Sequence, residues 1–184
     1  PGGLLHVLVE VRVQSLALDR TTNTPVVILQ ELDGDRVLPI WIGPGEASAI
    51  AMQLAEMEFS RPLTHDLICS VLSGLGGDLQ RVIITKVQKS TYYAELIVRR
   101  NGEVISLDAR PSDSIAVALR VDARIFADDQ LLEVATIEIS DDETTGEVWF
   151  ERLGGLDPEA AMGPEELKRH LKGLNPEDFG RFTP

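Results

Sequence analysis

Apolar and polar residues alternate along the first part of the chain. The alternation at residues 7–13 has the period of two that is typical of a half-buried strand. The apolar run 26–29 and the segment 36–42 predict two further strands, joined by a hairpin at Asp33-Gly34. Pro39 places the third strand at a sheet edge or a bulge, because proline cannot donate a ladder hydrogen bond. The N-terminal part is therefore predicted to be an antiparallel meander.

Helix-like sequences follow this meander. Residues 46–57 are rich in helix formers. Residues 64–75 place apolar side chains at the spacing of an amphipathic helix, and the glycines after them predict its end. Thr64 is a natural N-cap, and Asp66 then falls in the positively polarised first turn.

A second meander is predicted in the middle of the chain. Strands are expected at residues 81–87, 92–98 and 104–108. Asn101-Gly102 is a strong type I′ hairpin signal between the last two. A short helix is expected to start with Ser112 as N-cap and Asp113 in its first turn, and 124–126 forms a last short strand. The predicted class is α+β, with a mixed or antiparallel sheet of two meander-like halves and packed helices.

Charge divides the chain unevenly. The net charge is −13, but residues 1–123 carry only −4, whereas 124–184 carry −9. We therefore predict a main domain at 1–135 and an acidic C-terminal extension at 136–184 with one or two short helices. Residues 136–139 alternate as a strand would. This balance leads us to expect no long basic docking surface for nucleic acid, but it is compatible with a small metal- or anion-binding pocket in the main domain.

Composition also restricts the location of the protein. No apolar run reaches the length of a membrane span, so we expect no membrane segment. The single cysteine, Cys69, rules out an internal disulfide framework and fits a reducing compartment. The first residues lack a secretory signal. Together these features predict a cytoplasmic protein. By residue type, Cys69 and Trp41 are expected to be core residues.

Two polar stretches at predicted helix starts carry the candidate chemistry, at residues 61–66 and 108–113. Each offers a cation, a carboxylate and unpaired backbone N–H groups, which together suit a phosphate or a metal-bridged anion. The candidate catalytic residues are His65, Asp66, Asp108, Asp113 and Glu46, and the candidate phosphate-binding residues are Arg61, Thr64, Arg110 and Ser112.

A metal site is one way to use these groups. If the two helix starts meet, Asp66, Asp108 and Asp113 are positioned to ligate Mg²⁺ or Mn²⁺, with His65 as general acid or base. No organic cofactor is expected. The alternative is structural: the same carboxylates and hydroxyls are ordinary helix caps, and the arginines are ion-pair partners that fix turns.

Several strings in the sequence resemble the bifunctional nuclease family, whose bacterial members were long catalogued as a domain of unknown function. They are Leu38-Pro39-Ile40-Trp41-Ile42-Gly43, Glu46-Ala47, Arg61-Pro62-Leu63-Thr64-His65-Asp66-Leu67, Tyr93-Ala94 and Asp108-Ala109-Arg110-Pro111-Ser112-Asp113-Ser114. The similarity runs from about residue 9 to 132 and leaves out the acidic extension. The family takes its name from a plant member reported to cut both DNA and RNA. The resemblance implies a compact α+β fold that forms a homodimer or larger homo-oligomer. It also implies that the nine candidate residues given above belong to the site, but it does not assign a role to each of them.

Three functions remain open at this point. The first is a divalent-metal-dependent nuclease acting on DNA or RNA. The second is a non-enzymatic regulatory module that binds a nucleotide or another small phosphorylated anion in the same pocket. The third is an oligomeric structural domain in which the motifs are folding elements.

Overall fold

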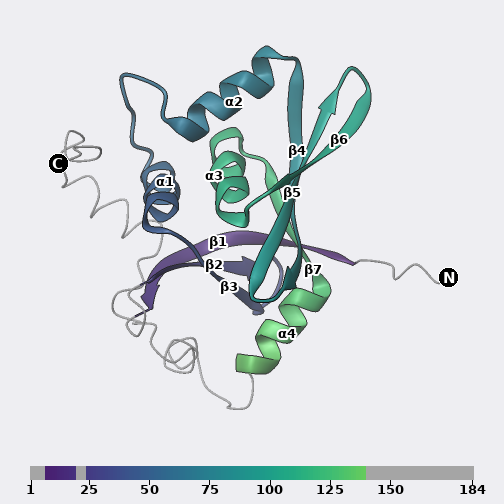
Figure 1. Cartoon of the computed structure of the whole chain (residues 1–184). Helices are drawn as coiled ribbons and strands as arrows, with labels where there is room; N and C mark the ends of the chain where they lie inside the picture. The colour runs from purple at the N-terminus through teal and green to yellow at the C-terminus, as the bar shows by residue number, and fades with distance from the viewer. Residues whose placement is uncertain (1–6, 20–23, 140–184) are drawn as a thin grey trace.

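The computed structural model describes residues 7–19 and 24–139, in which four helices are arranged around a sheet of seven strands (Figure 1). The strands are β1 (Leu8–Asp19), β2 (Thr24–Glu31), β3 (Val37–Trp41), β4 (Gly77–Gln88), β5 (Thr91–Arg100), β6 (Glu103–Ala109) and β7 (Arg124–Asp128). The helices are α1 (Pro44–Leu54), α2 (Thr64–Gly74), α3 (Pro111–Val121) and α4 (Asp129–Ile139).

The sheet consists of two antiparallel meanders joined by one strand. Its order is β3-β2-β1-β7-β4-β5-β6. Strand β7 lies between the halves, antiparallel to β1 and parallel to β4. The predicted α+β class with two meander-like halves is therefore confirmed. The parallel pair arises because α3 separates β6 from β7 and carries the chain back to the middle of the sheet.

Local turn chemistry fixes the register of the second meander. Asn101 and Gly102 have φ of 52° and 83°, as a type I′ turn between β5 and β6 requires. Lys89 and Ser90, between β4 and β5, also have positive φ, at 50° and 61°. Pro39 lies in β3 at the sheet edge, as predicted, where its missing N–H breaks no ladder.

Three helices cover one face of the sheet. Figure 1 shows α1, α2 and α3 on the same side, with α3 between the other two and the sheet, and α4 on the opposite side near β3. Helix α3 is the most deeply buried, since Ile115, Ala116, Val117 and Ala118 are almost fully covered. Its small alanines allow neighbouring backbones to approach closely. Within the described part of the chain, no helix is long and apolar enough to cross a membrane.

The caps of two helices differ from the sequence prediction. Leu63, not Thr64, is the N-cap of α2, and Arg110, not Ser112, is the N-cap of α3. In α3 the reason is Pro111: its fixed φ suits the first helical position, and it keeps the preceding residue extended. In α2 the Asp66 carboxylate accepts the Leu63 N–H at 2.8 Å, so an acceptor three residues later replaces a hydroxyl cap.

The prediction of a strand at residues 136–139 is wrong. These residues form the last turn of α4, which begins where the Asp128 carboxylate accepts the Gln130 N–H at 3.0 Å. Leu131, Leu132 and Ala135 follow at helical spacing and are buried. A four-residue alternation is too short to outweigh that cap and that packing. The acidic extension from residue 140 onward, with its predicted short helices, lies outside the described residues.

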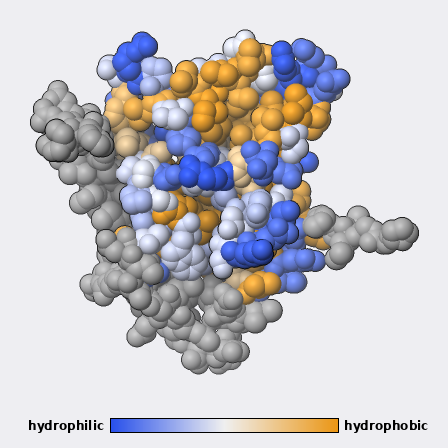
Figure 2. Space-filling model, in the orientation of Figure 1, coloured by the Kyte–Doolittle hydropathy of each residue, from blue (hydrophilic) through white to orange (hydrophobic). Residues whose placement is uncertain are grey.

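An apolar surface remains exposed on the side of the sheet that carries the helices. Helix α2 exposes one stripe of its apolar residues, and β6 exposes two apolar residues that pair with buried Leu96 and Val98 of β5. We name this surface the α2–β6 face; it consists of Leu67, Val71, Leu75, Ile105 and Leu107. Figure 2 shows apolar residues gathered across this upper part of the molecule. Such a patch marks an interaction surface more often than chance exposure.

Candidate active site at three helix starts

Three helices begin close to one another. Helices α1 and α2 both pack on α3, and charged side chains from the first turns connect all three. The first N–H groups of each helix have no partner within the helix. They give each start a partial positive charge that favours anions nearby. The sequence analysis had set the meeting of the starts of α2 and α3 as the condition for a shared site, and the structure adds the start of α1 to them.

Four ionisable side chains, Glu46, His65, Arg110 and Asp113, form a continuous series of contacts, which we name the charged cluster. His65 Nε2 lies 3.0 Å from Asp113 Oδ1. Arg110 donates from Nε to Asp113 Oδ2 at 2.6 Å, and its Nη1 lies 2.8 Å from Glu46 Oε1. Each helix thus contributes at least one member, and Arg110 and Asp113 form the centre.

His65 is the one residue of α2 that is classed as buried, with 8% of its surface exposed. Its bond to Asp113 uses Nε2, so Nδ1 is the ring nitrogen left for a ligand. A carboxylate that holds one imidazole nitrogen fixes both the orientation of the ring and its tautomer. His65 is therefore positioned as a proton acceptor or donor with Asp113 as its orienting partner.

The Asp113 carboxylate is held in its ionised form. Burial opposes ionisation, but the hydrogen bonds from Arg110 and His65 outweigh burial and lower the pKa of Asp113 below its usual value of 3.8. A lowered native pKa stabilises the fold above the unfolded pKa, and this stabilisation is lost as the pH falls through the native pKa. The cluster is therefore intact at neutral pH and weakens in acid.

Arg110 remains available to a ligand although it has two carboxylate partners. About 65% of its side chain is exposed, so its ion pairs compete with water and are individually weak. Both carboxylates raise its pKa, which keeps the guanidinium charged. An exposed guanidinium beside helix N-termini is a typical phosphate ligand.

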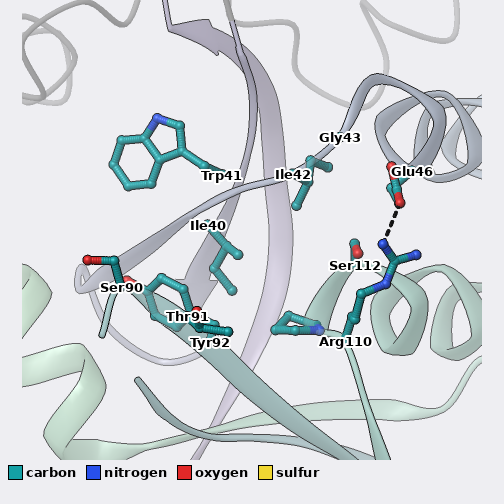
Figure 3. A pocket seen from close by; sticks show the side chains of 11 residues that line it. Ile40, Trp41, Ile42, Gly43, Glu46, Ser90, Thr91, Tyr92, Arg110 and Ser112 are labelled. Atoms are coloured by element: carbon teal, nitrogen blue, oxygen red, sulfur yellow. Dashed lines mark ion pairs between the residues drawn. The ribbon is translucent and has the colours of Figure 1, made fainter. Parts of the chain in front are cut away.

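Two hollows meet at Arg110 and Glu46, which line both. The smaller hollow, of about 250 Å³, also contacts Trp41, Tyr92 and Ser112. Figure 3 shows Trp41 on one side of it and the Glu46–Arg110 ion pair on the other. The larger hollow, of about 560 Å³, contains the remaining cluster members and an apolar floor. Its other lining residues include Ala49, Met52, Thr64 and Ile68.

Gly43 gives Glu46 its position. The carboxylate of Glu46 folds back over the N-cap of α1, and a Cβ atom at Gly43 would overlap it. A side chain at 43 would therefore require the flexible Glu46 carboxylate to move from its observed position.

Asp66 belongs to a second, separate cluster. Its Oδ1 accepts a hydrogen bond from Arg120 Nε at 2.6 Å, and Arg120 also donates to the backbone carbonyls of Ala116 and Ala49 at 2.8 and 3.3 Å. Only 6% of the Arg120 side chain is exposed. Arg120 thus ties α1, α2 and α3 together, and Asp66 is its counter-ion. No sequence signal singled out Arg120, because its partner is 54 residues away.

The other candidates lie apart from the charged cluster or at its margin. Asp108 is exposed on β6 and pairs in register with Glu95 of β5. Arg61 is exposed in the connection between α1 and α2. Asp66, Asp108 and Asp113 are therefore not brought to one point. Across residues 7–19 and 24–135, no three His, Cys, Asp or Glu side chains are grouped so as to hold a metal ion.

Two residues expected in the core have a different environment. Trp41 is 41% exposed and lines the smaller hollow, because it ends the edge strand β3. Cys69 is half-buried, and burial raises the pKa of its thiol, which disfavours the reactive thiolate. Trp41 therefore lines a hollow of the candidate site, which the sequence analysis did not predict. The signal available in the sequence was the internal proline of its strand, which indicated an edge strand and thus an exposed strand end.

The fold and the site define a small α+β domain with a cluster of ionisable side chains at converging helix starts. The sequence model of the bifunctional nuclease domain matches residues 27–140, and the chain belongs to that family. An uncharacterized protein of Mycobacterium tuberculosis (strain ATCC 25618 / H37Rv) is 42% identical over 173 residues, which cover 92% of this chain and 97% of that protein.

Plant relatives carry the family name. Bifunctional nuclease 1 of Arabidopsis thaliana is 27% identical over 100 residues, covering 52% of this chain and 31% of that protein. Bifunctional nuclease 2 of Oryza sativa subsp. japonica is 28% identical over 111 residues, covering 58% of this chain and 34% of that protein. The chain therefore matches about one third of each plant protein.

The buried pair of Asp66 and Arg120 predicts a stability effect. Arg120→Met should lower the free energy of unfolding by about 2 kcal/mol, because Asp66 loses its partner. The expected loss is smaller than for a fully buried ion pair, because Asp66 is partly exposed to water. Arg99→Met is the matched control, because Arg99 and its partner Asp78 are both exposed, and it should stay within about 0.5 kcal/mol of the parent. Urea denaturation measures both. Equal effects of the two substitutions would contradict the structural role of Arg120.

Proposed function

We propose that this chain is a nuclease that hydrolyses phosphodiester bonds of DNA and RNA at the charged cluster. Family membership supports the reaction class. The observation that supports the location is the bonded series of His65, Asp113 and Arg110, which places a proton-transfer group beside an exposed guanidinium.

Arg110 is the proposed anchor for the scissile phosphate. A phosphate at its free edge lies near the starts of α1 and α3, whose unpaired N–H groups favour the charge that develops on phosphorus. Because Arg110 already contacts Asp113, the phosphate is held next to the carboxylate that orients His65. Binding and proton transfer are thereby coupled through one residue.

His65 is the proposed general base. It takes a proton from the attacking water at Nδ1 as the water oxygen bonds to phosphorus and the bond to the leaving ester oxygen breaks. The resulting imidazolium is stabilised by Asp113 and then returns the proton to the leaving oxygen, so the ring is regenerated. Asp113 stays ionised throughout, in agreement with its lowered pKa.

A divalent cation fits the cluster only in part. Mg²⁺ and Mn²⁺ take oxygen ligands, and one or two carboxylates suffice where phosphate and water complete the shell. Glu46 and Asp113 are the two carboxylates here, but both already bond to Arg110. We therefore propose that Glu46 and Asp113 would hold a divalent cation when a phosphate is bound at Arg110. A bound cation would supply further charge stabilisation on phosphorus.

Substitutions in the cluster should separate catalysis from folding. His65→Gln and Asp113→Asn should each lower kcat by about 10²–10⁴-fold on single-stranded DNA and RNA, since each removes the oriented proton acceptor. Asp78→Asn is the control and should keep full activity, because Asp78 is an exposed residue paired with Arg99. Cleavage that persists in both cluster variants, with the fold intact by circular dichroism, would overturn the assignment.

Metal dependence has its own test. Cleavage by the parent chain should be abolished by EDTA and restored by Mg²⁺ or Mn²⁺. Glu46→Gln should raise the metal concentration needed for half-maximal rate about tenfold, because one ligand loses its charge. Full activity in EDTA would exclude the metal while leaving the role of His65 standing.

The second candidate function is a non-enzymatic module that binds a nucleotide or another small phosphorylated anion. The small size of the hollows at Arg110 favours it, since a mononucleotide needs only a pocket and a polymer needs a longer track. Thermal stabilisation by a mononucleotide, combined with no cleavage of any polymer under any metal condition, would favour this function over the nuclease.

We also propose that the chain forms a homodimer through the α2–β6 face. The exposed stripe of α2 and the free edge strand β6 lie on the same side of the sheet, and a twofold axis would cover both at once. Because the face is apolar on both partners, a second copy is complementary to it.

Association through this face should be sensitive to charge. The double variant Leu67→Lys and Val71→Lys should convert a dimer into a monomer in light scattering after size exclusion, because it places charges in the apolar contact. Val87→Lys is the control, since Val87 is similarly exposed but lies outside the face. A parent chain that is monomeric at micromolar concentration would refute the proposal.

A further inference from the structure

The smaller hollow beside Arg110 has an aromatic wall that phosphate chemistry does not need. Trp41 and Tyr92 line it together with Ser90 and Thr91 from the β4–β5 turn, on the side away from Arg110 (Figure 3). We propose that this hollow is a nucleobase subsite, in which the base next to the phosphate on Arg110 stacks on the Trp41 indole. The proposal rests on the proposed function only in placing that phosphate.

The indole of Trp41 is fixed and yet accessible. Its Nε1 donates to Asp19 Oδ2 at 2.9 Å, and Asp19 is itself buried. The N–H is therefore satisfied by the protein, while 41% of the residue stays exposed. Covering an exposed aromatic ring with a stacked base removes apolar surface from water, which favours binding. Because the ring is already held in one orientation, it loses little conformational entropy when the base stacks on it.

The dimensions of the hollow suit one base. Its volume of about 250 Å³ lies just below the range of about 300–1,000 Å³ that is typical of pockets for drug-sized ligands. A single base, with its sugar directed toward Arg110, fits this space, whereas a stacked dinucleotide does not. Aromatic residues in single-strand binding sites act in the same way, one base for each ring.

Hydroxyl groups provide the polar contacts. Ser112 lines the hollow with only 7% of its surface exposed, so its hydroxyl is held in a largely buried position at the start of α3. Ser90 and Thr91 present two more hydroxyls at the rim. A hydroxyl both donates and accepts, so the three groups accommodate the edges of different bases. The subsite is therefore expected to accept any base, with stacking as the main contribution.

The position of the hollow connects it to the cluster. Glu46 and Arg110 form its far wall and also line the larger hollow, so a ligand phosphate on Arg110 lies at the boundary between the two. A nucleotide whose base occupies the smaller hollow thus directs its phosphate toward Arg110 and the start of α3. The proposed substrate therefore lies with its base on the Trp41 side and its phosphate at Arg110, and His65 is on the far side of the phosphate.

Binding of small ligands tests this inference without any cleavage. The full chain with Trp149→Phe leaves Trp41 as its single tryptophan. Titration with AMP should quench the Trp41 fluorescence in a saturable way, whereas ribose 5-phosphate, with the same phosphate and no base, should not. By calorimetry AMP should bind about tenfold more tightly than ribose 5-phosphate, as expected for one stacked base.

Substitution of Trp41 separates the base contact from the phosphate contact. Trp41→Leu should raise the Kd of AMP about tenfold, to that of ribose 5-phosphate, and should leave the latter unchanged. Trp41→Phe should restore part of the difference, which a merely structural role of the indole would not do. Arg110→Met should instead weaken both ligands.

Two results would overturn the subsite: equal affinity of AMP and ribose 5-phosphate for the parent chain, or an AMP preference that survives Trp41→Leu. Failure of the proposed nuclease function gives a different pattern, in which no polymer is cleaved but AMP still quenches Trp41. That pattern would support the subsite and assign the chain to the nucleotide-binding alternative.

Discussion

The contact between Arg110 and Asp113 organises the site. Arg110 is the N-cap of α3 because Pro111 follows it and keeps it extended. From that position its side chain reaches Asp113 one turn ahead and Glu46 on α1, while Asp113 holds His65 on α2. One backbone constraint therefore brings charged groups from three helices together. Without Arg110, two carboxylates and an imidazole would meet with no cation between them.

Two arginines lie where α1, α2 and α3 meet, and the difference in their solvent exposure indicates different roles: one stabilises the fold and the other is available to bind a ligand. Arg120 is almost fully buried, and each of its three guanidinium nitrogens donates to Asp66 or to a backbone carbonyl group. Arg110 makes similar ion pairs but exposes most of its side chain. Because the Arg120–Asp66 pair is largely buried, it holds the helices together. Because Arg110 is open to solvent, it is able to exchange a carboxylate partner for a phosphate.

Local signals in the sequence were sufficient for the seven strands of the sheet and the Asn101-Gly102 turn, but they placed the N-cap of α3 at Ser112, two residues beyond Arg110. Features that depend on distant partners were not accessible. Asp66 was grouped with Asp113 because both open helices, but Arg120, far along the chain, determines its role. Trp41 was assigned to the core by residue type, although Pro39 had already indicated that its strand lies at an edge or a bulge; the sheet order shows that it is an edge.

The central claim is that His65 and Asp113 act as one unit, and a double-mutant cycle on kcat/KM for single-stranded DNA tests it most directly. If Asp113 acts by orienting His65, the variant with both His65→Gln and Asp113→Asn should be no slower than the more impaired single variant, because the second substitution removes nothing further. If the two losses multiply, the residues act independently, and that result would contradict the account.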